Sequence, residues 1–196
     1  KSTELGSAAV KAAMERAGVS GDQVEQIFMG CVLPAGLGQA PARQAALGAG
    51  LPLSVEATTV NKMCGSGMQA AMMAHDALLA GTADVIVAGG MESMTRAPHL
   101  LPSSREGIKF GSAALVDSMA HDALTCAFDG VSMGIAMDRG NGDYAFITRE
   151  RQDELAARSH RLAAQAQRQG VLSEEIAPVE VRDRRGGLGL VEHDEG

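Results

Sequence analysis

The fold of this chain is decided by the stretch Val60-Asn61-Lys62-Met63-Cys64-Gly65-Ser66-Gly67-Met68. Residues 55–60, which lead into it, are rich in valine and threonine and predict a short buried strand. After it, apolar residues recur at helical spacing as far as Leu79, which predicts a helix. The sequence therefore places Cys64 on a tight turn between a strand and a helix.

The turn gives Cys64 the surroundings of a nucleophile. A cysteine at a helix start meets the positive end of the helix dipole and several N–H groups without helical partners. Both features favour the thiolate, which is the nucleophilic form of the side chain. Gly65 and Gly67 lack Cβ atoms, so we expect them to relieve crowding in the turn and to leave room for a substrate. We predict that Cys64 accepts an acyl group, as the serine of G-x-S-x-G hydrolases does on a comparable turn.

Two other interpretations of this stretch stay open. Cys64 could be a buried structural cysteine, because free cysteine is among the most frequently buried residue types. The run from Gly65 to Ala70 also fits the G-x-G-x-x-A pattern of dinucleotide-binding turns. That pattern expects an acidic residue at the end of the second strand, whereas Asp84 precedes the next predicted strand.

The composition describes an acidic chain of 196 residues with a formal net charge of −7 and no tryptophan. This charge argues against a nucleic-acid partner, and no apolar run approaches the ~18 residues that a membrane span requires. The cysteines Cys31, Cys64 and Cys126 show neither paired nor metal-ligand spacing, so we expect no metal site. Unpaired cysteines are typical of a reducing compartment, which predicts a cytoplasmic protein.

Helical and strand patterns alternate through the first half of the chain. Helices are predicted over residues 3–17, 41–50 and 68–79, and strands over residues 26–33, 55–60 and 85–88. We expect Gly89-Gly90 to end the last of these strands. This alternation predicts an α/β fold, a parallel sheet with helices on both faces. Ligands of such sheets bind beyond the carboxyl ends of the strands, which is where Cys64 is expected.

The pattern changes after residue 94. Residues 95–147 hold many glycines, serines and prolines and only short apolar groups, which is typical of a loop-rich insertion. Thr148 is expected to cap a long helix that ends near Gly170, and a short extended segment follows. From about residue 183 the chain is rich in glycine and charge, so a mobile tail is predicted.

Several of these segments resemble the thiolase family. The stretch around Cys64 is similar to the acyl-enzyme cysteine motif of that family. Its residues resemble those of the acetyl-CoA C-acetyltransferases in particular. Further similarities run through residues 29–33, 36–45, 84–94, 133–134 and 148–153. The resemblance implies a thiolase-like core over residues 1–94 and an incomplete loop domain that binds CoA over residues 95–196.

The resemblance also implies a reaction. Cys64 takes an acyl group from an acyl-CoA as a thioester, and acetyl-CoA then attacks it to give a 3-oxoacyl-CoA, or the reverse thiolysis occurs. Leu124 and Met133 are implied to line the path of the pantetheine arm. CoA thioesters are the implied substrates, with no other cofactor, and the implied assembly is a homodimer or homotetramer.

Departures from the family pattern favour an alternative. The first strand of the family and its second half, with the G-H-P histidine and a second cysteine, have no counterpart here, so the chain looks truncated. The resemblance places the missing strand at the centre of the sheet, which predicts a gap there. The alternative is a non-catalytic fragment or half-subunit that accepts acyl groups but needs a partner or the missing half for turnover.

Overall fold

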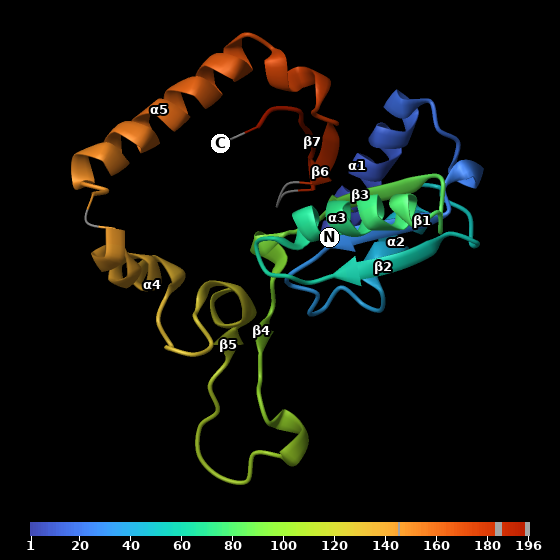
Figure 1. The fold of residues 1–196 in the computed structure, drawn as a ribbon. Coiled ribbons are helices and arrows are strands. Elements are labelled where there is room, and N and C mark those ends of the chain that lie inside the picture. The colour runs from blue at the N-terminus through green and yellow to red at the C-terminus, as the bar shows by residue number, and fades with distance from the viewer. Residues whose placement is uncertain (145, 183–185, 195–196) are drawn as a thin grey trace. The chain divides into compact units, whose positions relative to one another are not determined.

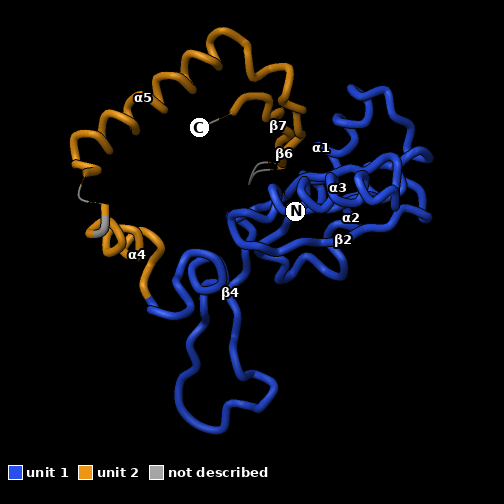
Figure 2. Tube along the Cα trace, viewed as in Figure 1, with its two compact units in different colours: residues 1–130 blue, residues 131–196 orange. Residues whose placement is uncertain are grey.

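A computed structural model describes residues 1–144, 146–182 and 186–194 of the chain (Figure 1). The chain divides into two compact units, residues 1–130 and residues 131–196 (Figure 2). This boundary lies beyond the predicted division between residues 94 and 95. The segment after β3 belongs to the first unit, where Met119, Ala123 and Leu124 line a pocket together with residues of the sheet edge.

The first unit is built on a parallel sheet of three strands: β1 (Gln26–Gly30), β2 (Glu56–Val60) and β3 (Ile86–Gly90). The strand order is β2-β1-β3, so β1 is hydrogen-bonded on both sides. Gly30 is level with both Val60 and Gly90, which means that the carboxyl ends of all three strands meet at one edge. The predicted parallel sheet is confirmed. The predicted gap at its centre is wrong, because the three strands pair without interruption.

Helices cover both faces of this sheet. On one face, α1 (Ser2–Ala17) and α2 (Pro41–Gly48) share a buried core with Ile27 and Met29 of β1. Side chains alternate between the faces of a strand, so the even positions of β1 point to the opposite face. There α3 (Ser66–Leu79) packs against the sheet, and its first residues lie against Gly30. The predicted arrangement of helices on both faces is thus confirmed.

The boundaries of these helices follow from their sequences. Gly18 ends α1 in the left-handed conformation with φ of 65°, and Pro41 occupies the first turn of α2, both as expected. A short 3-10 turn, η1 (Gly21–Gln23), joins α1 to β1.

The glycine pair at the end of β3 behaves differently from the prediction. Gly89 and Gly90 are the last two residues of β3, so the strand runs two residues past its predicted end at Ala88. A Cβ atom added to Gly90 would lie 3.6 Å from the Gly67 Cα atom, and one added to Gly89 would lie 3.4 Å from the Met29 sulfur. The pair therefore serves close packing on both faces of the strand, and its pairing with β1 continues to Gly30.

Beyond β3 the first unit has short elements only. They are η2 (Met94–Arg96), β4 (His99–Leu100), η3 (Ser104–Glu106), β5 (Val116–Asp117) and a π-helical turn, η4 (Met119–Leu124). β4 and β5 form an antiparallel pair with His99 opposite Asp117. This agrees with the loop-rich character that the composition predicts for the segment.

The second unit contains α4 (Met133–Gly140), η5 (Asn141–Tyr144), α5 (Arg149–Arg168), η6 (Val171–Glu174), β6 (Val179–Arg182) and β7 (Leu188–Val191). The Thr148 hydroxyl accepts a hydrogen bond from the Arg151 N–H and caps α5, as predicted. Within the described ranges, no helix is both long and apolar enough to cross a membrane.

The tail predicted from about residue 183 falls partly outside the described residues, at 183–185 and 195–196. Leu188–Val191 is not an unstructured tail, because it pairs antiparallel with β6 from Val179 to Arg182. Glycine and charge surround the short apolar run of this strand, and all of its side chains are exposed, so it was not predicted.

Candidate active site

Cys64 lies on the turn between β2 and α3, where the sequence places it. β2 ends at Val60 and α3 begins at Ser66, with Gly65 as its N-cap residue. Cys64 is therefore two residues short of the helix and at the carboxyl edge of the sheet. Its side chain is exposed, so the interpretation of Cys64 as a buried structural cysteine is wrong.

The residue before Cys64 has an unusual backbone conformation. Met63 has φ of 49°, in the left-handed region that residues with side chains rarely adopt. The Asn61 side-chain oxygen accepts the Met63 N–H at 3.0 Å. The buried Ser66 hydroxyl donates to the Met63 carbonyl oxygen at 2.6 Å and accepts the Lys62 N–H at 2.9 Å. These bonds offset the cost of the strained residue and hold the turn that presents Cys64.

We predict that Ser66→Ala lowers the free energy of unfolding by about 1–2 kcal/mol. Its hydroxyl is buried and joins two backbone groups of the turn, and the loss of two such hydrogen bonds costs about that much. Urea denaturation followed by circular dichroism measures the change. Ser104→Ala is the matched control, since Ser104 is exposed and should change stability by less than about 0.5 kcal/mol. Equal effects of the two changes would contradict the role assigned to Ser66.

The N–H groups around Cys64 are held within the turn. Those of Met63, Gly65 and Ser66 are all hydrogen-bonded there, and Cys64 forms an isolated β-bridge with Lys62. These bonds fix the backbone on both sides of the thiol.

The space around the two glycines of the turn, Gly65 and Gly67, differs from the prediction. A Cβ atom added to Gly65 would lie 3.4 Å from the Lys62 oxygen, and one added to Gly67 would lie 3.9 Å from the Gly89 oxygen. Both distances are ordinary contacts, so the expectation that these two glycines relieve crowding is wrong. The crowded position is Gly30 at the end of β1, where an added Cβ atom would lie 2.8 Å from the Gly67 nitrogen.

A cavity of about 410 Å³ opens beside Cys64, entirely within the first unit. Its walls come from the carboxyl ends of β1 and β3, from the start of α3 and from η4. The lining includes Cys64, Glu92, Met119, Ala123 and Leu124. Within the described part of the chain, no group of three histidine, cysteine, aspartate or glutamate residues could hold a metal ion.

The two other predicted site residues have different positions. Leu124 lines the same cavity as Cys64, and its predicted contact with the pantetheine arm stays a prediction. Met133 is the first residue of α4 in the second unit and is half exposed. Its predicted role therefore also stays a prediction.

Sequence reasoning missed two residues in the cavity wall. The Glu92 carboxylate accepts the Val32 N–H at 2.7 Å and lies 3.9 Å from the Cys31 sulfur. Burial raises the pKa of the Cys31 thiol to about 11, and the nearby carboxylate adds to this effect. Both residues follow the carboxyl ends of strands, so the rule that places ligand sites at that edge could have found them.

We predict that the free energy of unfolding falls as the pH rises from about 9 to about 11. The Cys31 thiol keeps its proton in the folded chain up to about pH 11, whereas in the unfolded chain it ionises near its ordinary pKa of 9.0. The stabilisation is therefore complete below pH 9 and is lost across this range. Urea titrations at several pH values should show a steeper fall for the unaltered chain than for Cys31→Ser. Equal slopes would contradict the prediction.

Comparison with known proteins places these observations in a family. The thiolase N-terminal domain family model matches residues 1–196. An acetyl-CoA acetyltransferase of Cupriavidus necator is 50% identical over 192 residues, covering 98% of this chain and 49% of the relative. A probable acetyl-CoA acetyltransferase of Mycolicibacterium smegmatis is 50% identical over 194 residues, covering 99% of this chain and 50% of the relative.

A fungal relative has the same extent of similarity. The cytosolic acetyl-CoA acetyltransferase of Gibberella zeae is 47% identical over 193 residues, covering 98% of this chain and 48% of the relative. The chain thus spans about half the length of these curated relatives. The family model matches the whole sequence, including the turn at Cys64 and the strands of the parallel sheet. On this evidence the chain belongs to the thiolase family.

Proposed function

We propose that the chain carries the acyl-accepting part of an acyltransferase that acts on CoA thioesters, with Cys64 as the nucleophile. The observation that carries the proposal is an exposed thiol on a hydrogen-bonded turn beside a cavity with many apolar side chains. The names of the relatives support acetyl-CoA as a substrate. The cysteine splits one difficult acyl transfer into two easier steps.

In the first step the Cys64 thiolate attacks the carbonyl carbon of an acyl-CoA. The bond between that carbon and the CoA sulfur breaks, CoA leaves as a thiolate that takes up a proton, and the acyl group remains on Cys64. A backbone N–H beside the nucleophile would stabilise the carbonyl oxygen while it carries negative charge.

In the second step acetyl-CoA loses an α-proton, and the resulting carbanion attacks the acyl-Cys64 carbonyl to release a 3-oxoacyl-CoA and free Cys64. Thiolysis is the reverse. The proton needs a base, and the described residues that line the cavity include no histidine. Cys31 does not fit this role, because its pKa of about 11 keeps it protonated. The second candidate function is therefore the non-catalytic fragment or half-subunit. It would accept acyl groups but need a partner or the missing half for turnover.

Incubation with acetyl-CoA followed by intact mass and peptide mapping tests the proposal. We expect one acetyl group per chain, located on the peptide that contains Cys64. Cys31→Ser and Cys126→Ser are matched controls that should keep the adduct. Formation of acetoacetyl-CoA would favour complete catalysis, and an adduct without product would favour the second candidate. Failure to form an adduct, together with slow alkylation of Cys64 by iodoacetamide, would refute both.

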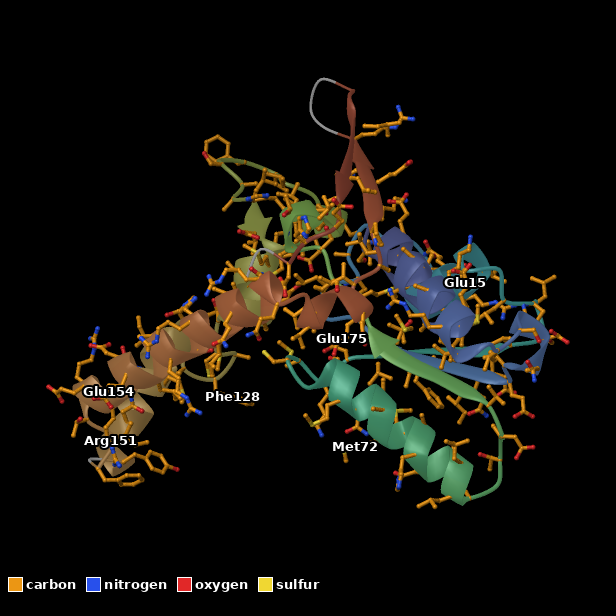
Figure 3. The ribbon with its side chains drawn as sticks, turned by 90° about the horizontal axis from the view of Figure 1, so that it is seen from above. Glu15, Met72, Phe128, Arg151, Glu154 and Glu175 are labelled. Carbon is orange, nitrogen blue, oxygen red and sulfur yellow. The ribbon has the colours of Figure 1, made fainter. Side chains whose placement is uncertain are left out.

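We further propose a cytoplasmic homodimer or homotetramer. Support comes from the cytosolic designation of the fungal relative and from apolar side chains that α3 leaves exposed, namely Met68 at 73% and Leu79 at 77%. Figure 3 shows Met72 on the same helix, also projecting outward. Sedimentation equilibrium tests the assembly, and a monomer at all concentrations would contradict it.

A further inference from the structure

The roof of the cavity beside Cys64 is made by an unusual element. Residues Met119–Leu124 form a π-helical turn, a rare structure that occurs frequently at functional sites. Met119, Ala123 and Leu124 of this turn all line the cavity. The remaining walls come from strand ends and from the start of α3, which the sheet holds in place.

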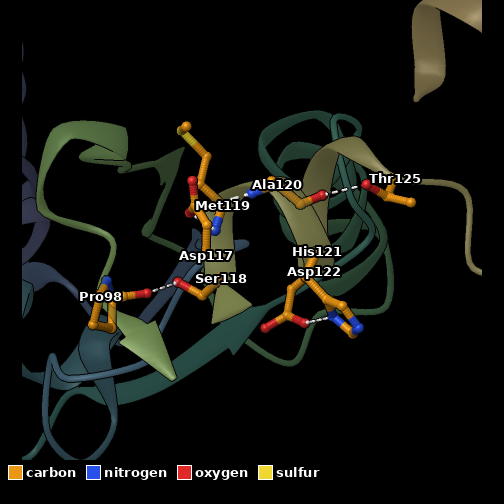
Figure 4. A network of polar contacts seen from close by, with 8 residues as sticks. All are labelled: Pro98, Asp117, Ser118, Met119, Ala120, His121, Asp122 and Thr125. Atoms are coloured by element: carbon orange, nitrogen blue, oxygen red, sulfur yellow. Dashed lines mark hydrogen bonds and ion pairs between the residues drawn. The ribbon is translucent and has the colours of Figure 1, made fainter. Parts of the chain in front are cut away.

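A network of polar contacts fixes the π turn (Figure 4). The fully buried Ser118 hydroxyl donates to the Pro98 carbonyl oxygen at 2.6 Å, and the Asp117 carboxylate accepts the Met119 N–H at 2.9 Å. At the other end, the Thr125 hydroxyl donates to the Ala120 carbonyl oxygen at 2.7 Å. The turn is therefore tied at both ends, and the side chains of its inner face occupy defined positions.

The wide turn determines which side chains face the cavity. Hydrogen bonds of a π turn close between residues five apart, so Met119 and Leu124 lie one turn from each other on the same side. Ala123, next to Leu124, also reaches this side. In an α-helix, residues three and four apart share a face, so Met119 and Ala123 would still meet there while Leu124 would turn away.

The chemistry of the cavity suits a hydrocarbon chain. Besides Met119, the lining holds Met63, Met91 and Met94, and methionine adapts to irregular apolar ligands. Glu92 is the one carboxylate among the lining residues, and it disfavours phosphate groups. The acyl group of a thioester starts at the Cys64 sulfur, so the adjoining apolar space is the natural place for its chain.

We propose that Met119 and Ala123, held by the π turn, set the length of the acyl chain that Cys64 accepts. The large side chain of Met119 takes up space in the cavity, whereas the small side chain of Ala123 leaves space open. The assignment of an acyl chain as the ligand rests on the proposed function. The limit on the length of a chain attached to Cys64 depends on the shape of the cavity alone, so it can be tested without any acyl transfer.

The first experiment measures acylation of Cys64 in the chain of residues 1–196 by acetyl-CoA and by hexanoyl-CoA, using intact mass. Met119→Ala should raise the ratio of hexanoyl to acetyl transfer by at least about 10-fold, because each methylene accommodated in an apolar pocket changes discrimination by that order. Ala123→Leu should lower the ratio by a similar factor. Leu53→Ala, at an exposed position outside the cavity, is the control and should leave the ratio unchanged.

The second experiment replaces the thioesters with N-ethylmaleimide and N-hexylmaleimide, which alkylate Cys64 without any acyl transfer. The ratio of hexyl to ethyl modification should shift in the same directions in Met119→Ala and Ala123→Leu. Circular dichroism shows whether each variant is folded, and Met119→Leu, a change of similar volume, provides a third folded variant with a small expected shift.

The two experiments separate the two proposals. A shift with maleimides but no acylation by any CoA thioester would refute the proposed function and leave the limit on chain length standing. Acylation with ratios that do not move in the folded variants would overturn the assignment of Met119 and Ala123 and leave the proposed function intact. Ratios that move opposite to the expected directions would also overturn it.

Discussion

Cys64→Ser is expected to reduce acyl transfer from acetyl-CoA by at least about 1,000-fold, the order of loss seen when an enzyme nucleophile is removed. Serine keeps the size of the side chain but presents a hydroxyl, which is a weak nucleophile unless a base takes its proton. The described residues that line the cavity offer no histidine for that purpose. The expected result is therefore a folded chain that forms no acetyl adduct.

The measurement is the rate of adduct formation by intact mass, with Cys126→Ser as the matched control. Cys126 lies in the first unit but outside the lining of the cavity, so its loss should leave the rate within about twofold of the unaltered chain. An adduct that persists in Cys64→Ser at the original rate would assign the acyl group to another residue and remove the basis of the proposed function.

Gly30→Ala is expected to lower the free energy of unfolding by about 3 kcal/mol, a large part of the total for a domain of this size. A Cβ atom at this position would lie 2.8 Å from the Gly67 nitrogen and from the carbonyl carbon and Cβ atom of Ser66. Two of these three atoms belong to the backbone of α3, so no side-chain rotation relieves the contact. The helix start must move away from the sheet, and Cys64 must move with it.

Gly67→Ala is the matched control from the other side of the same contact. Its added Cβ atom would meet the Gly89 oxygen at 3.9 Å, which is an ordinary contact, and alanine favours a helix over glycine by about 0.5–1 kcal/mol. Stability should therefore stay equal or rise. Denaturant unfolding of both variants measures the difference, and equal stabilities would show that the close approach at Gly30 has no energetic consequence.

Much of the first unit could be predicted from the sequence because its signals are local. Apolar periodicity located the three strands and the helices between them, and Pro41 and Gly18 marked helix boundaries that the structure confirms. The turn at Cys64 followed from the change between two periodicities at one point in the chain. The family resemblance added the acyl-transfer chemistry, which periodicity alone does not contain.

The features that escaped prediction depend on contacts between distant segments. The two-residue extension of β3 through Gly89 and Gly90 escaped prediction, because the contacts of Gly90 with Gly67 and of Gly89 with Met29 cannot be seen in local sequence. The π turn likewise depends on the bond from Ser118 to Pro98, twenty residues earlier in the chain. The pairing of β7 with β6 joins two short strands whose side chains are mostly exposed, so no buried face marks them in the sequence.

The contact of α3 with Gly30 and Gly90 also bears on the thermodynamics of substrate capture. At this junction the polypeptide backbones touch directly, without intervening side chains whose rotamers could fluctuate. The hydrogen-bonded sheet thus fixes the position of the Cys64 sulfur before any ligand binds. When a thioester binds, the protein backbone around Cys64 has little conformational freedom left to lose. The entropic cost of binding therefore falls mainly on the ligand.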